Sequence, residues 1–165
     1  MNKEKTMTSN PNNNSALLSC LTKPVTIGRL MGYLHRHSRM YFHREFSRWN
    51  MGSGCHPFLM ILWQQDGLTL KELTHSLHLD KANTTRTIAR LTKLGYVRKK
   101  KDENDGRAFR IYLTEKGRKL IPQMKKVMMH WTNIMTDGLS DEEKREAIRL
   151  LQKMADNAVT HVRQS

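Results

Sequence analysis

Apolar side chains recur at helical spacing along a long segment near the start of the chain. Between residues 26 and 49 they return every three or four positions, which places them on one face of an α-helix. The stripe consists of Ile27, Leu30, Met31, Leu34, Tyr41, Phe42, Phe46 and Trp49. Arginines occupy the other face. One short neighbour cannot cover so long a stripe, so we expect either a partner subunit or a long helix from later in the chain to pack on it.

Two shorter helices and a tight turn are predicted next. Residues 56–65 are very apolar and predict a short buried helix. Thr69 and Glu72 have the spacing of a capping box, in which a hydroxyl and a carboxylate each satisfy a free amide at a helix start. Asp80 is placed to cap the following helix, and Gly95 to end it. This order predicts a helix-turn-helix.

The second of these helices has two distinct faces. Thr84, Ile88 and Leu91 share the inward face, and small or basic residues share the outward one. A basic strand over residues 96–101, turn chemistry at 102–107 and an alternating segment at 108–113 then predict a hairpin. A helix followed by a basic hairpin suits DNA, because the helix fits the major groove and the hairpin tip reaches the next groove.

Two long helices are expected after the hairpin. Residues 114–117 open the first, which carries Pro122 either as a kink or within its first turn. Its apolar stripe consists of Leu120, Ile121, Met124, Met128, Trp131 and Met135. Ser140 and Glu143 form a second capping box. The last helix turns inward Ala147, Leu151, Met154, Ala155, Ala158 and Val162.

These elements define a mainly α fold with a small β-hairpin wing. We expect a flexible tail at 1–23, the N-terminal part of a dimerisation region at 24–54, a winged helix-turn-helix DNA-binding domain at 55–113, and C-terminal dimerisation helices at 114–165. Terminal helices with apolar stripes that flank a small basic module suggest a two-fold dimer.

Charge supports a polyanionic partner. The 165 residues contain 29 lysines and arginines against 15 acids, a net charge of +14. Residues 69–113 hold 11 basic and 5 acidic groups, the densest positive field in the chain. Two cysteines make no disulfide framework, and no run is long and apolar enough for a membrane span, so we expect a cytoplasmic protein with no membrane partner.

In these features the sequence resembles the MarR family of winged-helix regulators. The resemblance rests on LTLKELTHSL, on Thr85-Arg86 followed by Gly95-Tyr96-Val97, on the DENDGR wing signature at 102–107, and on LTEKG at 113–117. It implies a homodimer on a palindromic operator, usually a repressor, whose recognition helices lie about 34 Å apart. It also implies release from DNA by a small lipophilic or phenolic effector or by oxidation of a cysteine.

Candidate DNA contacts lie on the outward helix face and on the wing. Arg86 and Arg90 suit bidentate contacts with guanine or a phosphate, and Asn83 suits adenine. By resemblance, Arg107 is the wing arginine, oriented by Asp105 while Asp102 caps the turn. The full set is Lys81, Ala82, Asn83, Thr85, Arg86, Arg90, Lys93, Lys99, Lys100 and Arg107. For each of these side chains, an ordinary surface role is the alternative.

An effector site is expected, by resemblance, between the winged module and the helical platform. Its candidates are Tyr33, His37, Met40, Met60, Trp63 and Trp131, which would serve equally well as core residues. Cys20 and Cys55 are redox candidates, because Cys55 precedes His56 at a helix start, which lowers a thiol pKa, but inert thiols are favoured. The histidines lack the clustering of a metal site, so no metal or cofactor is expected.

Two rival functions follow from other features. Net charge alone favours a general architectural nucleic-acid-binding protein, which would show a low ratio of specific to random binding. An enzyme is disfavoured, because the sequence contains no glycine-rich phosphate loop, nucleophile elbow or zinc-protease motif.

Overall fold

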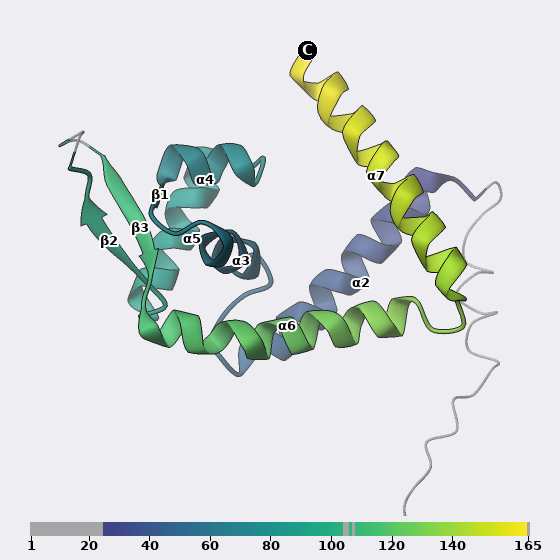
Figure 1. The fold of residues 1–165 in the computed structure, drawn as a ribbon, viewed down its shortest axis with the longest axis horizontal. Helices are drawn as coiled ribbons and strands as arrows, with labels where there is room; N and C mark the ends of the chain where they lie inside the picture. The colour runs from purple at the N-terminus through teal and green to yellow at the C-terminus, as the bar shows by residue number, and fades with distance from the viewer. Residues whose placement is uncertain (1–24, 104–105, 107, 165) are drawn as a thin grey trace, which may run out of the picture. The chain divides into compact units, whose positions relative to one another are not determined.

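The computed structural model describes residues 25–103, 106 and 108–164. The expected tail at 1–23, Cys20, Asp105 and Arg107 therefore lie outside the described residues. The described elements, in chain order, are α2 (Ile27–Ser47), α3 (His56–Gln64), β1 (Leu68–Thr69), α4 (Leu70–Ser76), α5 (Lys81–Lys93), β2 (Val97–Lys101), β3 (Phe109–Leu113), α6 (Glu115–Met135) and α7 (Asp141–Gln164) (Figure 1). The prediction of a mainly α fold with a small β wing is confirmed.

The chain forms two compact units, which divide within α2. The first ends at Met40 and the second begins at Tyr41. The second unit contains the complete helix-turn-helix and the wing, so the geometry below that concerns DNA belongs to this unit alone. The predicted boundaries at residues 54 and 113 stay predictions.

Side-chain caps set the helix starts where the sequence predicted them. The Glu72 backbone N–H donates to Thr69 Oγ1 over 3.2 Å, and Glu72 Oε2 accepts from the Thr69 backbone N–H over 2.7 Å. Asp80 Oδ1 accepts from the Asn83 backbone N–H over 2.7 Å at the start of α5. A second capping box joins Ser140 to Glu143 at the start of α7. Such caps contribute about 1 kcal/mol each.

Gly95 ends α5 in the left-handed region, with a φ of +75°. Its N–H donates to the Thr92 carbonyl over 2.9 Å, and the Tyr96 N–H donates to the Leu91 carbonyl over 3.0 Å. This is a Schellman motif, which glycine favours because a Cβ is disfavoured at positive φ. The chain then leaves directly into β2.

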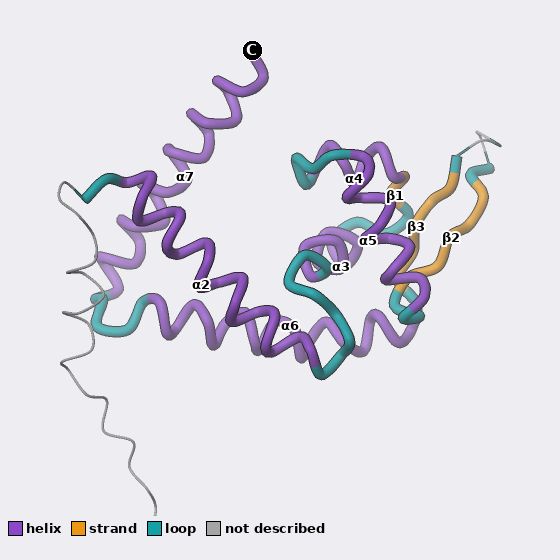
Figure 2. Tube along the Cα trace, turned by 180° about the vertical axis from the view of Figure 1, so that it is seen from behind, coloured by secondary structure: helices purple, strands orange, loops and turns teal. Residues whose placement is uncertain are grey.

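Three antiparallel strands form the sheet, in the order β1-β3-β2 (Figure 2). Val97 pairs with Leu113 and Lys101 with Phe109, so β2 and β3 form the predicted hairpin. β1 was not predicted. It pairs Leu68 with Ile111 and attaches the start of the helix-turn-helix to the wing.

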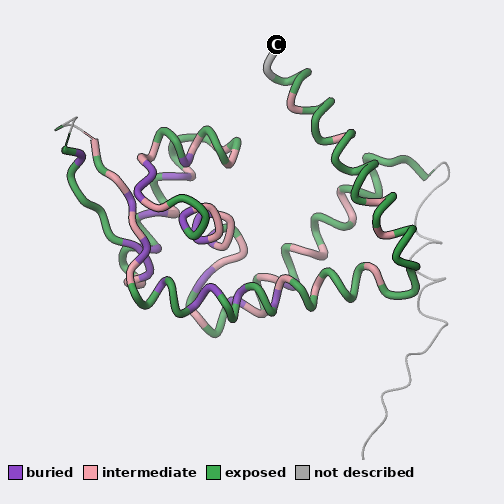
Figure 3. Tube along the Cα trace, in the orientation of Figure 1, coloured by how far each residue is buried: buried purple, intermediate pink, exposed green. Residues whose placement is uncertain are grey.

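One hydrophobic core holds α3, α4, α5, the sheet and the first half of α6 together (Figure 3). The inward face predicted for α5 is confirmed, because Thr84, Ile88 and Leu91 are fully buried. Other fully or almost fully buried side chains are Phe46, Phe58, Leu59, Leu62, Leu73, Ile111, Ile121 and Met124. Each large apolar side chain buried in this way contributes about 1.5–3 kcal/mol, so the winged module has a substantial core of its own.

α6 is continuous through Pro122, which lies in its interior. The alternative that placed Pro122 in the first turn is therefore wrong. Proline has no N–H, so Pro122 cannot donate to the carbonyl of Arg118, one turn earlier. Pro122 itself is exposed, while the adjacent Ile121 is buried.

The terminal helices, by which we mean α2 and α7, bury much less. Only Tyr41 and Phe46 are buried in α2. None of residues 141–162 in α7 is buried. Exposed apolar residues in α2 are Ile27, Leu30, Met31, Leu34 and Met40; those in α7 are Ile148, Leu150, Leu151 and Val162. Of the side chains predicted to face inward on α7, Ala147 and Met154 are half-buried, while Leu151, Ala155, Ala158 and Val162 are exposed.

Candidate nucleic-acid interface

The outward face of α5 presents the predicted residues to solvent. Arg86 is exposed and makes no hydrogen bond or ion pair with the described part of the chain. The other members of the predicted set on α5 are also exposed, except for Asn83, which is half-buried. Thr85 already donates its hydroxyl to the Lys81 carbonyl over 2.8 Å. An arginine held on a rigid, well-capped helix is suited to bidentate contact with a base edge or a phosphate.

Arg90 lies one turn after Arg86 and differs from it. Its Nη2 donates to the backbone carbonyl of Asn50 over 2.8 Å, in the loop that follows α2. Asn50 itself has a left-handed φ of 55°. The bond gives Arg90 a structural role, because it connects α5, the recognition helix of the helix-turn-helix, to that loop. The predicted DNA contact of Arg90 therefore requires its side chain to bind both DNA and the Asn50 carbonyl. Arg86 makes no such bond with the described residues.

The wing carries the predicted basic strip. Arg98, Lys99, Lys100 and Lys101 are all exposed on β2. Lys100 Nζ pairs with Glu103 Oε1 over 2.7 Å, so part of its charge is compensated. Arg107 lies outside the described residues, and its predicted DNA contact stays a prediction.

An ion pair that the sequence did not predict lies near the turn end of the hairpin, just beyond the Lys101–Phe109 pair. Arg110 Nε lies 2.7 Å from Asp102 Oδ2, and the Asp102 side chain is only 5% exposed. Arg110 Nη1 also donates to the Gly67 carbonyl over 2.9 Å, next to β1. A cap of the turn by Asp102 was an alternative from the sequence, and it stays a prediction. The Asp102 backbone N–H closes the hairpin on the Ala108 carbonyl, while its carboxylate binds Arg110. Only the pairing register brings these residues together, so local sequence carried no clear signal of the contact.

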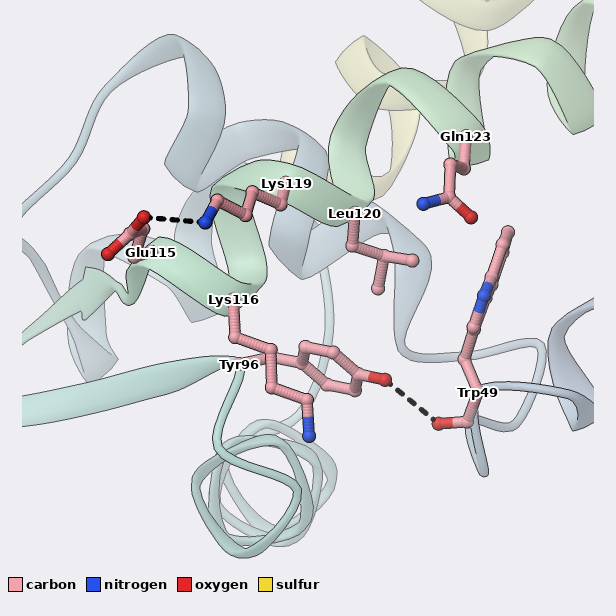
Figure 4. A pocket seen from close by; sticks show the side chains of 7 residues that line it. All are labelled: Trp49, Tyr96, Glu115, Lys116, Lys119, Leu120 and Gln123. Atoms are coloured by element: carbon pink, nitrogen blue, oxygen red, sulfur yellow. Dashed lines mark hydrogen bonds and ion pairs between the residues drawn. The ribbon is translucent and has the colours of Figure 1, made fainter.

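The end of the recognition helix is braced against α6 and the α2–α3 loop (Figure 4). The Tyr96 hydroxyl donates to the Trp49 carbonyl over 3.2 Å, and Lys116 Nζ lies 4.9 Å from the centre of the Tyr96 ring. Lys116 also donates to the Leu94 carbonyl over 2.9 Å, and Thr114 donates to the Gly95 carbonyl over 2.7 Å. These contacts fix the direction in which the chain passes from α5 into the wing. A surface pocket of about 420 Å³ lies beside them.

The predicted effector residues belong to different parts of the chain. The rings of Tyr33 and His37, both on α2, are tilted against each other with centroids 4.0 Å apart, and Met40 is exposed. Trp131 stacks on Tyr41 at 4.7 Å. Trp63 is exposed, with Lys125 over its ring, and Met60 packs against the core. An effector site formed by all six side chains stays a prediction.

The structure contradicts one expectation about Cys55. A position at a helix start beside His56 was expected to lower its pKa. Instead, Cys55 is 4% exposed, and burial raises the pKa of its thiol. Burial likewise lowers the pKa of His56, which disfavours the imidazolium that would stabilise a thiolate. Desolvation outweighs the helix start because the thiolate is the form that burial penalises. Burial and a raised pKa both disfavour the thiolate of Cys55, which supports the favoured prediction of an inert thiol.

No three-residue group of metal-binding type occurs within the described ranges. His75 and His78 lie near each other, with ring centroids 6.3 Å apart, but no cysteine or carboxylate joins them in such a group. Nor does any helix in residues 25–103, 106 and 108–164 combine the length and the apolar character needed to cross a bilayer.

A helix-turn-helix whose second helix, α5, is capped and has an exposed basic face, followed by a hairpin wing with a basic strand, defines the winged helix-turn-helix class of DNA-binding transcriptional regulators. The MarR family model matches residues 57–109 of this chain. A MarR transcriptional regulator from Methanosarcina mazei Go1 is 38% identical, with a TM-score of 0.78 over 81% of this chain and 96% of that chain. The chain belongs to the MarR family.

Two further relatives agree with this assignment. The HTH-type transcriptional regulator BilQ of Clostridioides difficile (strain CD3) is 28% identical over 123 residues, which cover 74% of this chain and 83% of the relative. A MarR-family regulator from Listeria monocytogenes, solved as a complex with 26mer DNA, shares the fold at 24% identity, with a TM-score of 0.75 over 81% of this chain and 89% of that one. As a transcriptional regulator of this family, the protein is not an enzyme.

Proposed function

We propose that the protein is a cytoplasmic transcriptional repressor that binds a palindromic operator as a homodimer. Each α5 would enter a major groove, and each wing would probe the flanking minor groove. One observation carries the proposal: α5 is anchored by a buried face and presents Arg86, unengaged by the described residues, on the opposite face. The Listeria relative solved with 26mer DNA supports DNA as the partner.

Arg86 would read sequence, whereas the wing lysines would hold the backbone. A bidentate arginine–guanine contact discriminates against a wrong base by about 1–3 kcal/mol. Lys99 and Lys100 lie exposed on an edge of the wing, where phosphate contact adds affinity at any sequence. Lys81, Ala82, Asn83, Thr85, Arg90 and Lys93 complete the proposed contact surface on α5.

The exposed apolar faces of the terminal helices support a homodimer. Ile27 on α2 is 62% exposed, and Ile148 on α7 is 65% exposed. Apolar residues at regular helical spacing rarely stay in water over such lengths, and a second copy of the chain would cover them. A two-fold dimer would place the recognition helices about 34 Å apart, one turn of the duplex.

A small lipophilic or phenolic effector would release the DNA. It would act by binding the DNA-free state more tightly than the DNA-bound state, since a ligand with equal affinity for both shifts nothing. Tyr33, His37, Met40, Met60, Trp63 and Trp131 remain the candidates for its site. Aromatic and thioether side chains of this kind suit an apolar ligand.

Selection of bound duplexes from a random pool with the purified protein tests the function. The proposal predicts an enriched palindromic motif and a complex of two chains per duplex, measured by sedimentation. An enriched sequence without symmetry, or one chain per site, would contradict the dimeric operator.

A general architectural DNA-binding role is the second candidate, favoured by the net charge of +14. The same selection separates the two. An architectural protein would enrich no motif, and its affinity for a selected duplex would stay close to its affinity for a random one. A sequence-specific regulator typically separates the two affinities by at least about 10³.

A further inference from the structure

A groove with a volume of about 850 Å³ lies between the helix-turn-helix and the wing. One wall comes from α4 and the turn after it, with Lys71, His75 and His78. Lys81, the first residue of α5, lies at the same groove, and Phe109 of β3 belongs to the wing side. All of these residues belong to the second compact unit, so the groove is part of a single body.

Basic and titratable side chains dominate the polar lining of the groove. Lys71, Lys81 and the two histidines line it together with Thr69 and Thr74, and no acidic residue of the described part of the chain does. The nearest acids in sequence are already engaged as helix caps: Glu72 accepts from Thr69, and Asp80 accepts from Asn83. On the wing side, the described lining residues Ala108 and Phe109 carry no charge. The groove therefore favours an anion, and more strongly when the imidazoles are protonated.

His75 lies in the last turn of α4, and His78 lies in the turn that follows it, so both histidines line this groove. His78 has a left-handed φ of 50°, a conformation that glycine or asparagine adopts at lower cost. Its N–H donates to the His75 carbonyl over 3.2 Å. The two imidazole rings are exposed and have centroids 6.3 Å apart. Two adjacent donors at one edge suit contact with successive oxygens of a phosphate chain.

We propose that His75 and His78, together with Lys71 and Lys81, bind the phosphate backbone of DNA and make DNA affinity rise on acidification. The proposal rests on the proposed DNA-binding function. A duplex that contacts α5 and the wing would approach Lys81 and Phe109, which line the groove, and its phosphates match the charge there. Histidine is the side chain that generally gains its positive charge between about pH 8 and about pH 5.

Fluorescence anisotropy with a labelled random-sequence duplex tests this. The dissociation constant is measured against sodium chloride concentration at about pH 8 and about pH 5.5. The slope of log K against log salt should steepen by about 0.9 for each histidine that gains a phosphate contact, or about 2 for the pair. The variant H75Q/H78Q should lose this change and keep its affinity at the higher pH. The control H43Q/H130Q removes two exposed histidines outside the groove and should behave as wild type.

Three outcomes would overturn the proposal. If H75Q/H78Q keeps the pH-dependent slope while the wild type binds DNA, the histidines do not contact phosphate, and the DNA-binding function stands. If the wild type binds no duplex at either pH, the proposed function itself fails. If sodium phosphate of equal ionic strength weakens wild-type binding much more than it weakens H75Q/H78Q, the groove prefers free phosphate over the DNA backbone.

Discussion

The winged module and the terminal helices both carry regular apolar stripes, but only one of them buries its stripe within the chain. In the winged module, Ile88, Leu91 and Ile111 are fully buried. On α7, Leu151 is 49% exposed and Val162 is 75% exposed. An apolar stripe at helical spacing thus corresponds to a buried core in the winged module and to a solvent-exposed face on α7. The winged module buries its apolar stripe in a core of its own, whereas the apolar stripes of the terminal helices are exposed where the proposed second copy of the chain would pack.

Truncating one isoleucine in each region should produce the largest difference in the free energy of unfolding between the two regions. I88A removes a fully buried side chain and should lower the free energy of unfolding by about 2–5 kcal/mol. I148A truncates a side chain that is 65% exposed and should change the stability of the winged module by less than about 0.5 kcal/mol. Urea unfolding, followed by the fluorescence of the tryptophans, measures both. Equal losses of unfolding free energy in I88A and I148A would contradict the difference in burial between the two regions.

Adding a methyl group should have opposite effects in the two regions. A Cβ at Gly117, in α6, would lie 2.2 Å from the Tyr96 carbonyl oxygen, so G117A must displace backbone and should cost about 1–3 kcal/mol or more. A Cβ at Gly32, in α2, would meet only the Arg36 side chain at 3.5 Å. G32A should therefore stabilise its helix by up to about 1 kcal/mol. Thermal unfolding of the two variants compares the signs, and a stabilised G117A would contradict the close packing of α6 on the wing.

A charge on the exposed apolar face should weaken self-association. L151E places a carboxylate where we propose a partner chain, and the dimer dissociation constant should rise at least about tenfold, or about 1.4 kcal/mol. Q152E adds the same charge at the adjacent exposed position and should leave association unchanged. Sedimentation over a concentration series separates them. If both variants dimerise like the wild type, α7 does not form the interface through this face.

Acidification should weaken the capping of α4 slightly. The backbone and side-chain hydrogen bonds from Thr69 hold the pKa of Glu72 below its usual range. A lowered folded-state pKa stabilises the fold above the unfolded-state pKa, and this stabilisation is lost as pH falls through the folded value. Because Glu72 is exposed, the effect should stay below about 1 kcal/mol. E72Q should flatten the dependence of stability on pH below about pH 4.5 relative to wild type, and an unchanged pH profile would contradict this role.

Local chemistry explains why much of the fold was predictable. The helix caps and the turn at Gly95 join residues that are close together in the sequence, so spacing alone could predict them. The residues that make them are Thr69, Asp80, Gly95 and Ser140. The inward face of α5 was equally readable, because helical periodicity depends on neighbouring positions only.

Features that depend on distant contacts were not predictable. The two-residue strand β1 exists because Leu68 pairs with Ile111, far along the chain. Arg110 finds Asp102 only once the hairpin register is set. Burial raises the pKa of Cys55, whereas its local position suggested a lowered one. Arg90 was assigned to DNA from its helix face, and its bond to Asn50 depends on where the α2–α3 loop passes.

The most direct test of the account measures the affinity of wild type and R86A for the selected operator and for a random duplex, at one salt concentration. If the winged module reads sequence through α5, R86A should lose about 1–3 kcal/mol more on the operator than on the random duplex for each arginine–guanine contact. K100A, the matched wing variant, should lose affinity about equally on both duplexes. An equal loss on both duplexes for R86A would contradict sequence readout by the recognition helix.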